Sequence, residues 1–549
     1  MKTDINALLI AVIKDALEEL SPQRGVFDKL KEGLYLELPK DNRFGDLASN
    51  IALRLAAQLK SPPAQIAGEL ADNIKARLKK CGLEPYVKEV KAAGGFINFY
   101  LQEKYFYDYL ADIVRKGKKT LRFNAGRGRK VLLEFVSANP TGPLSVAHAR
   151  QAAVGDALAK VLDFAGFKVK KEYYLNDEGN QINILGHSVE LRLKELEGKR
   201  IEFPEDHYHG DYISDIARNV KAKKCRVGDF GTYAADYILK IIKRELRDFR
   251  VEFDCWYSQK ALRKSGKIEK ALRFLEQKDL LYRQDGAVWF KSTRFGDDKD
   301  RVVVKSDGSY TYLAPDIAYH REKYRRGFTW LINLWGPDHH GYISRIKAAV
   351  QALGKDADSL SLIIVQLATI FRAGQQIQMS TRRGQYITLR EVLDDVGCDA
   401  ARFFFMMRRT DSHLDFDLEV AKKKTSENPV YYVQYAHARI SSILGNSPLR
   451  LKTRELNPVL LEEPEEIALI KKLWELFYIL EVCLKTTDPY MLTVYLQELA
   501  ETFHKFYDRH RVLGQDQQLT QARLALIEAC RIVISCGLDL LGISSPRKM

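Results

Sequence analysis

Apolar strand candidates alternate with amphipathic helices over the middle of the chain, from about residue 130 to residue 420. The strand candidates are KVLLEFVS (130–137), VKKEYYLN (169–176), TWLINLWG (329–336) and SLIIVQLATIF (361–371), the last of which also fits a helix. Such alternation is typical of a parallel sheet with helices on its faces. We therefore predict a multidomain α/β fold with this sheet at its centre.

The flanking regions have different patterns. Residues 1–112 combine helical stretches with the short strand candidate GGFINFYL (94–101), which indicates a small α/β domain. A basic linker is predicted at 113–130, and the sheet domain at 131–425 contains a more polar, helix-rich insertion at about 186–300. Residues 426–549 are predicted to form an all-helical domain, because helical periodicity continues after Asn428-Pro429 to the end of the chain.

Composition and charge narrow the class of protein. The 549 residues carry 87 Lys and Arg against 72 Asp and Glu, a formal net charge of +15. The apolar fraction of 46% excludes a disordered chain. The net charge favours a polyanionic partner, since residues 115–130 hold eight basic residues and no acidic one. The alternative is a merely solvated linker.

Membrane and metal sites are not predicted. The longest apolar stretch without charge, residues 359–371, is thirteen residues long, short of the roughly 20 that cross a bilayer. The N-terminus shows no signal-peptide pattern, so we expect a cytoplasmic protein. The seven cysteines are scattered without a CxxC pair, which argues against disulfides and structural zinc. We read His207 and His209 as part of a polar loop.

The first segment with candidate functional residues follows the strand at 130–136. A loop containing Asn139, Pro140 and Gly142 leads into a helix that begins near Val146. A loop between a parallel strand and a helix N-terminus is a natural phosphate cradle, because free backbone N–H groups and the helix dipole face the anion. His148 lies in the first helical turn, where a catalytic role and a solvated or capping role are equally compatible with the pattern.

The second segment is QMSTRRG (378–384), a small polar loop before a helix. The adjacent arginines Arg382 and Arg383 could stabilise charge that develops during triphosphate cleavage. Taken alone, the segment is better explained as a solvated basic turn.

Together the two segments resemble the HIGH-type and KMSKS-type signature motifs of class I aminoacyl-tRNA synthetases, and their surroundings resemble bacterial arginyl-tRNA synthetases. The matching segments run in the family's order from end to end. They are RFGDLASNIALRLA (43–56), GGFINFYL, EFVSANPTGPLSVAHARQAAVGDALA (134–159), EYYLNDEGNQI (172–182), YLAPDIAYH (312–320), WGPDHHGYISRIKAA (335–349), MSTRRGQYITLREVLDDVG (379–397), VYYVQYAHARI (430–440), ETFHKFYDRHRVL (501–513) and GLDLLGISSPRKM (537–549).

The resemblance implies a Rossmann-type catalytic core, a tRNA-binding N-terminal domain and an anticodon-binding helical C-terminal domain. It also implies a set of catalytic residues, namely His148, Ser145, Ser380, Arg382 and Arg383. The implied ATP-binding residues are Pro140, Gly142, Ala147, His148, Met379, Ser380 and Thr381. The sequence departs from the family pattern because Ser145 and Ala147 replace a His and a Gly, and Gln378 and Thr381 replace two lysines.

The prediction of the arginine site starts from a carboxylate that needs a cationic partner. Glu134 stands within an apolar run and needs a cationic partner. From the residues alone, this partner is either a structural Arg or Lys or a substrate guanidinium. The resemblance favours the guanidinium, since the family's arginine site has a Glu five residues before an Asn. By the same resemblance, the substrate-binding residues are Glu134, Ser137, Asn139, Tyr312, Asp316 and His340.

The implied reaction has two steps, in which arginine and ATP form arginyl-adenylate and the arginyl group passes to tRNA(Arg). ATP is a substrate, Mg²⁺ accompanies it, and the family suggests a monomer. Residues expected to contact tRNA are Asn42, Arg43, Asp46, Tyr435, Arg439, Tyr507, Arg511 and Met549, whereas Phe503 and Phe506 are expected in the core.

Three alternatives remain at this point. The first is a synthetase-like protein that binds tRNA but has weak or no catalysis, because the signature motifs are altered. The others are a synthetase for another amino acid and a nucleotide-binding enzyme unrelated to tRNA.

Overall fold

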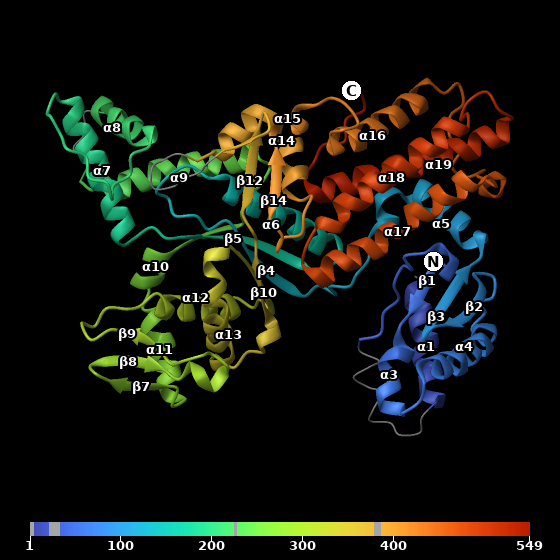
Figure 1. Ribbon diagram of the computed structural model, residues 1–549, viewed down its shortest axis with the longest axis horizontal. Helices are drawn as coiled ribbons and strands as arrows, with labels where there is room; N and C mark the ends of the chain where they lie inside the picture. Colours follow the sequence, from blue (N-terminus) through green and yellow to red (C-terminus); the bar gives the residue numbers. More distant parts are fainter. Residues whose placement is uncertain (1–4, 21–32, 224–227, 378–385) are drawn as a thin grey trace. The chain divides into compact units, whose positions relative to one another are not determined.

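The computed structural model describes residues 5–20, 33–223, 228–377 and 386–549 (Figure 1). These residues form two compact units, which we describe separately. The first unit spans 1–121, 440–481 and 499–533, and the second spans 122–439, 482–498 and 534–549. Helices near the C-terminus therefore contribute to both units.

The second unit is built around a five-stranded, all-parallel sheet with the order β11-β10-β4-β5-β6. Its strands are β4 (Lys130–Glu134), β5 (Lys168–Leu175), β6 (Cys255–Ser258), β10 (Trp330–Trp335) and β11 (Leu360–Ile364). Leu132, Leu331 and Leu360 from three of these strands are buried in one core with residues of the helices that follow β9 and β10. The prediction of a parallel sheet with packed helices is confirmed.

Two features of this unit differ from the sequence prediction. The segment 361–371 is neither one strand nor a helix, because its first half belongs to β11 and its second half forms β12 (Ala368–Arg372) in another sheet. The chain changes sheet at Gln366, whose N–H donates to the carbonyl of Thr410 over 2.8 Å. In addition, the predicted helix-rich insertion contributes β6, an edge strand whose four residues are too short to give a clear pattern.

The second unit contains the following further elements. Its helices are α6 (Val146–Phe164), α7 (Asn180–Leu196), α8 (Asp211–Lys223), α9 (Phe230–Asp248), α10 (Gln259–Lys264), α11 (Lys267–Gln277), α12 (Leu313–Arg325), α13 (Ile343–Ala352), α14 (Leu389–Phe405) and α15 (Leu418–Lys422). Two small sheets have the orders β7-β8-β9 and β13-β12-β14, with β7 (Leu281–Gln284), β8 (Ala287–Phe290), β9 (Arg301–Val304), β13 (Gln375–Gln376) and β14 (Leu414–Asp417).

Helix α6 packs unusually closely against the chain that leaves β4. A Cβ atom on Gly155 would lie only 2.4 Å from the ring of Phe135, so glycine is required at this contact. Because α6 is also fully buried along most of its length, the position of its N-terminus relative to β4 is fixed.

The first unit contains a three-stranded antiparallel sheet, β1-β3-β2, in the N-terminal part of the chain. Its elements are β1 (Leu47–Ser49), β2 (Val87–Ala93), β3 (Phe96–Leu101), α1 (Ile5–Leu20), α3 (Ile51–Leu59), α4 (Pro63–Lys80) and α5 (Glu103–Lys116). The later helices are α16 (Pro429–Asn446), α17 (Pro464–Thr486), α18 (Tyr490–Arg509) and α19 (Gln517–Leu541). The predicted helical C-terminal region is thus confirmed, and no described helix is long and apolar enough to span a bilayer.

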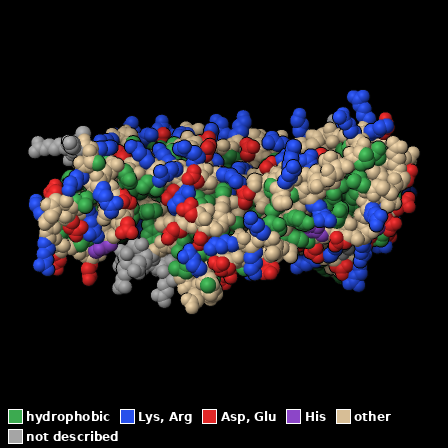
Figure 2. All heavy atoms as spheres, turned by 90° about the horizontal axis from the view of Figure 1, so that it is seen from above, with side chains coloured by type: hydrophobic (Ala, Val, Ile, Leu, Met, Phe, Trp, Pro, Cys, Tyr) green, Lys and Arg blue, Asp and Glu red, His purple; other side chains and the backbone are tan. Residues whose placement is uncertain are grey.

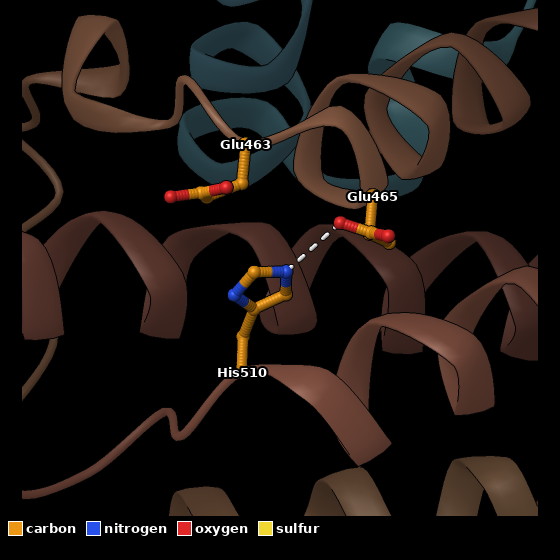
Figure 3. A group of neighbouring side chains, drawn as sticks. All are labelled: Glu463, Glu465 and His510. Carbon is orange, nitrogen blue, oxygen red and sulfur yellow. Dashed lines mark hydrogen bonds and ion pairs between the residues drawn. The ribbon is translucent and has the colours of Figure 1, made fainter.

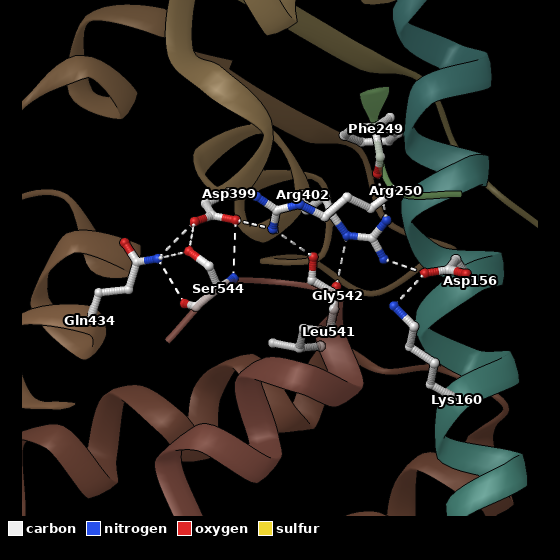
Figure 4. A network of polar contacts seen from close by, with 10 residues as sticks. All are labelled: Asp156, Lys160, Phe249, Arg250, Asp399, Arg402, Gln434, Leu541, Gly542 and Ser544. Carbon is white, nitrogen blue, oxygen red and sulfur yellow. Dashed lines mark hydrogen bonds and ion pairs between the residues drawn. The ribbon is translucent and has the colours of Figure 1, made fainter. Parts of the chain in front are cut away.

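The segment after α19 is held to the second unit by a buried polar network (Figure 4). The Arg402 side chain has no exposed surface and donates to the carbonyls of Leu541 and Phe249 over 2.8 and 2.9 Å, and to the Asp156 carboxylate over 2.7 Å. A Cβ on Gly542 would lie 2.4 Å from the guanidinium, and φ is +72° there. Glycine is therefore needed where the chain passes Arg402.

Candidate active site

The candidate site lies where the order of the parallel strands reverses. β4 and β10 are neighbours in the sheet, but the chain continues from β4 to β5 on one side and from β10 to β11 on the other. In open parallel sheets, ligands bind at the carboxyl ends of the strands at this switch point. Glu134 is the last residue of β4 and lies opposite Asn333 of β10.

The chain turns sharply after β4. Val136 and Ser137 both have positive φ values, +68° and +39°, in the region that side chains other than glycine rarely adopt. Such a conformation costs about 1–3 kcal/mol per residue and persists only where the surroundings enforce it. Here Ser137 Oγ accepts the N–H of Tyr174 over 3.0 Å, and the Tyr173 hydroxyl donates to the carbonyl of Ala138 over 2.8 Å.

Two tyrosines hold the predicted phosphate loop. The hydroxyls of Tyr212 and Tyr386 donate to the carbonyls of Thr141 and Pro143 over 2.8 and 3.1 Å. A Cβ on Gly142 would lie 3.1 and 3.2 Å from these same hydroxyls, which explains a glycine between them. Of the other predicted loop residues, Pro140 is buried, and Asn139 Nδ2 donates to Gln181 Oε1 over 2.6 Å.

His148 and Ser145 form a local pair at the start of α6. Ser145 is the N-cap, and its backbone N–H donates to His148 Nδ1 over 3.2 Å. Since Nδ1 accepts this bond, the ring proton of neutral His148 is on Nε2. Burial lowers the pKa of His148 to about 4, partly opposed by Asp338. At neutral pH the residue is therefore a neutral hydrogen-bond donor, and Ala147 lies beside it, half-buried.

The second signature segment, including Gln378, Met379, Ser380, Thr381, Arg382 and Arg383, lies outside the described residues. The chain that follows it pairs directly with the first segment. Val146 N–H donates to the carbonyl of Ile387 over 3.2 Å, and Leu389 N–H donates to that of Leu144 over 2.7 Å. Residues 387–389, which follow the second motif, are thus joined to the first motif by backbone hydrogen bonds, although the two segments are more than 200 residues apart in sequence.

Sequence reasoning missed two buried charged residues of the second unit, one of which, Glu245, contacts the loop before α6. Arg150 has no exposed surface, and its guanidinium donates to the carbonyls of Gln366, Arg409 and Ser412. Glu245 of α9 is 4% exposed, and burial raises its pKa to about 7 although it accepts the N–H of Leu144. The sequence signal for Arg150 was a charged residue within an apolar helix face, which indicates a buried charge. Its partners could not be predicted, because they are distant in sequence.

Glu134 has a lysine partner. Its carboxylate is nearly buried, at 7% exposed, and its Oε2 accepts a hydrogen bond from the ammonium of Lys323, which has no exposed surface. Ser137 Oγ donates to Glu134 Oε1 over 3.3 Å. The expectation that Glu134 requires a cation is therefore confirmed, and the structure supplies one of the two alternatives, a structural lysine.

Asp316 lies in the first turn of α12. Its Oδ2 accepts the hydroxyl of Tyr342 over 2.7 Å. Burial and the nearby Glu134 raise the pKa of Asp316 to about 7, against opposing effects of Tyr342 and Lys323. Two other predicted substrate residues are more exposed than we expect for residues that line a binding site. Tyr312 is 81% exposed, and His340 is exposed in the short 3-10 helix Pro337–Tyr342.

The residues predicted to contact tRNA fall into two groups. Arg43, Arg511 and Met549 are exposed, whereas Tyr435, Arg439 and Tyr507 are half-buried. Arg439 donates to the Tyr435 hydroxyl over 2.7 Å, and the side chain of Asn42 is outside the description. The predicted core residues Phe503 and Phe506 are buried. Lys and Arg side chains are spread over the face in Figure 2, with Asp and Glu among them.

Asp46, which is also predicted to contact tRNA, has partners within the protein. Its carboxylate is 10% exposed and accepts the N–H of Leu101 over 2.8 Å and the ammonium of Lys471 over 2.6 Å, within the first unit. A nearly buried acidic side chain with these partners favours a structural role, because a carboxylate repels phosphate.

One group of side chains has the spacing of metal ligands, namely Glu463, Glu465 and His510 (Figure 3). His510 Nε2 lies 3.0 Å from Glu465 Oε2, and the guanidinium of Arg509 pairs with the same carboxylate. The group also lies at the N-terminus of α17, whose dipole disfavours a cation. We interpret it as an ion-pair cluster.

Comparisons with known proteins cover the whole chain. Residues 110–442 match "tRNA synthetases class I (R), catalytic domain", residues 433–549 match "DALR anticodon binding domain", and residues 7–101 match "Arginyl tRNA synthetase N terminal domain". An arginine–tRNA ligase of Geobacter sp. (strain M21) is 47% identical over 533 residues, 94% of each chain. That of Syntrophotalea carbinolica is 44% identical, over 98% of this chain and 99% of its own.

A solved structure supports the fold. Thermus thermophilus arginyl-tRNA synthetase has a TM-score of 0.77 at 22% sequence identity and covers 100% of both chains. Together with the parallel sheet, these matches establish that the chain belongs to the arginyl-tRNA synthetase family.

Proposed function

We propose that this chain is an arginine–tRNA ligase that charges tRNA(Arg) through arginyl-adenylate. The observation that carries the proposal is the placement of Glu134 and Asp316 near the switch point of the sheet, where the helix bearing His148 also begins. ATP is the second substrate, as its relatives' class I chemistry implies. Neither the fold nor the relatives favour a protein that binds tRNA without charging it.

The arginine site is assigned as follows. Glu134 and Asp316 accept hydrogen bonds from the two sides of the guanidinium, which matches its planar fork of donors. Ser137 and Asn139 bind the carboxylate and amino groups. Tyr312 precedes Asp316 by one helical turn, so we assign it to close over the guanidinium when arginine binds. We assign His340 to line the arginine site on the same side as Tyr312.

The ATP site uses the loop before α6. Pro140, Gly142, Ser145, Ala147 and His148 bind the nucleotide, with the N-terminus of α6 facing phosphate. Residues 379–383 complete the site, and Arg382 or Arg383 supplies the cation that the family's lysines provide elsewhere. Mg²⁺ enters with ATP as part of the substrate, bound mainly by phosphates and water.

The remaining assignments concern the tRNA contacts, the oligomeric state, the location and the domain limits. Arg43 and neighbouring Asn42 contact the body of the tRNA, and the helical C-terminal domain, including Tyr435, Arg439, Tyr507, Arg511 and Met549, contacts its anticodon region. The protein acts as a monomer in the cytoplasm and uses no structural zinc. The domain limits predicted above, 1–112, 131–425 and 426–549, are part of the same proposal.

Aminoacylation of total tRNA tests the function directly. The purified chain is incubated with ATP, Mg²⁺ and each amino acid separately, and charged tRNA is measured. We expect charging with arginine alone. If arginine is charged, Arg382→Ala and Arg383→Ala identify which cation the reaction uses. Salt-sensitive tRNA binding without any charging would contradict the proposal.

Replacing His148 with Asn is expected to lower kcat by about 10²–10³, the usual effect of losing one donor to transition-state charge. The KM values for arginine and ATP should change much less, because the contact strengthens as charge develops on phosphate. Pyrophosphate exchange in the presence of tRNA measures the step. The matched variant Ser145→Ala keeps the backbone N–H that orients His148, so it should lose far less activity. A kcat loss below tenfold for His148→Asn would refute the role.

Arginine binding should depend on pH through Asp316. Its carboxyl has a pKa raised to about 7, so below this pH the free protein carries a neutral acid that must lose its proton to bind a guanidinium. The KM for arginine should therefore rise by about tenfold per pH unit below 7 and level off above it. Measurements from pH 5.5 to 8.5 check this. The slope should be absent from the KM for ATP and from Asp316→Asn.

A further inference from the structure

Lys323 is a fully buried lysine in the last turn of α12. Its ammonium donates to Glu134 Oε2 and, over 3.0 Å, to Asn333 Oδ1, and it lies 4.2 Å from the centre of the Tyr319 ring. A lysine without exposed surface needs such partners, because burying an unpaired charge is costly. All four residues belong to the second unit.

A chain of hydrogen bonds continues from Lys323 to the helix turn that carries Asp316. Asn333 Nδ2 lies 3.1 Å from His320 Nε2, and His320 Nδ1 lies 2.8 Å from the carbonyl of Asp316. Because a carbonyl only accepts, Nδ1 carries the ring proton and Nε2 accepts from Asn333. Burial and Lys323 lower the pKa of His320 to about 3, so His320 contributes no charge.

Apart from Arg345, the other described ionisable groups around the two carboxylates are paired or neutral. The Glu172 carboxylate is paired with the Arg326 guanidinium, and Glu178 has Arg263 at 3.8 Å. Arg345 lies over the ring of Tyr342, 5.4 Å from its centre. The pKa values of Tyr174, Tyr319 and Tyr342 are all raised by burial, so these phenols are uncharged. Among the described residues, Lys323 is thus the cation in direct contact with the predicted arginine ligands.

We propose that Lys323 is a positioning residue that determines which substrate charge the arginine site accepts. It holds Glu134 in place and reduces the net charge of the site from −2 to −1. One guanidinium then neutralises the site. The inference rests on the assignment of Glu134 and Asp316 as arginine ligands.

Two physical arguments support this role beyond a structural one. A buried ion pair contributes little net stability compared with apolar side chains of the same size. The pair is therefore poorly explained by folding alone. Moreover, Lys323 occupies Oε2 of Glu134 and leaves Oε1, with Ser137, as the oxygen that turns to the substrate. The lysine thus determines which oxygen arginine meets.

The test compares arginine binding by Lys323→Met and a matched variant, Lys160→Met, in the full chain. Lys160 also pairs with a buried carboxylate, that of Asp156, which keeps Lys171 and Arg402 as partners. In aminoacylation with saturating tRNA at pH 7, we expect Lys323→Met to raise the KM for arginine by at least about tenfold, because Glu134 loses the partner that positions it and the repulsion between the two carboxylates keeps Asp316 protonated. The KM for ATP should change less than about twofold, and Lys160→Met should change neither.

The pH profile separates charge from general damage. Without the ammonium, the two carboxylates repel each other more, so the midpoint of the pH dependence of the arginine KM should move above its position in the unmodified protein. A merely structural role would leave this midpoint in place. An unchanged arginine KM together with an unchanged midpoint would overturn the proposal.

A second pair of variants applies if Lys323→Met does not fold. Glu134→Gln leaves Lys323 as an uncompensated cation beside the guanidinium, whereas Glu134→Gln with Lys323→Met restores a site charge of −1. We expect the double variant to bind arginine at least about tenfold more tightly than Glu134→Gln alone. Equal or weaker binding would refute the charge role of Lys323. If Glu134→Gln and Asp316→Asn both keep the normal arginine KM, the assignment of the site itself is wrong.

Discussion

Asp316→Asn is expected to lower kcat/KM for arginine by about two to three orders of magnitude, which corresponds to about 3–4 kcal/mol of lost binding free energy. The substitution removes the negative charge but keeps the size of the side chain and an oxygen that accepts the Tyr342 hydroxyl. Because Lys323 already compensates Glu134, Asp316 provides the charge that a guanidinium meets. Its loss should therefore affect arginine far more than ATP.

The measurement is steady-state aminoacylation at saturating tRNA, with arginine and ATP varied in turn. The matched variant Asp415→Asn removes the same charge from an exposed strand residue of the same unit, and should change kcat/KM by less than about twofold. If Asp316→Asn charges tRNA with a normal arginine KM, the guanidinium is bound elsewhere, and the role of Tyr312 fails with it.

The fold could be predicted where periodicity is strong. The strands β4 and β10 are largely apolar runs, β5 lies within the predicted strand region, and α6 begins at the predicted Val146. The pattern failed at 361–371 because two consecutive strands without a turn signal between them look like one long apolar run. It also missed β6, whose four residues are all half-buried and match no single period.

The site could be predicted in part. A carboxylate in an apolar run requires a cation, which is correct for Glu134, but sequence cannot show that Lys323, 189 residues away, provides it. Likewise, the raised pKa of Asp316 depends on burial and on Glu134 rather than on its neighbours in sequence. The same limit applies to Asp46, since its nearly buried ion pair with Lys471 joins segments 425 residues apart.

Arg402→Met is expected to destabilise the second unit by about 3–5 kcal/mol, the usual cost of removing one partner from a buried charged network. The substitution leaves the carbonyls of Leu541 and Phe249 without their guanidinium donor. It also removes one of three cations around Asp156, whose pKa is lowered by Arg402, Lys160 and Lys171 despite burial. The C-terminal segment should consequently become accessible to carboxypeptidase, because Arg402 holds the chain at Leu541 and Gly542 (Figure 4).

An exposed ion pair provides the control for Arg402→Met. Arg218 is 63% exposed and lies 2.6 Å from Asp215 in the same unit, so Arg218→Met should change stability by less than about 0.5 kcal/mol. Thermal unfolding followed by circular dichroism, together with the rate of C-terminal digestion, compares the two variants. A loss below about 1 kcal/mol for Arg402→Met, with an intact C-terminus, would mean that apolar packing of α14 and α19 holds this segment without the guanidinium. Destabilisation with a protected C-terminus would instead assign the effect to the contacts with Asp156 and Phe249, because only the contact with Leu541 holds the C-terminal segment.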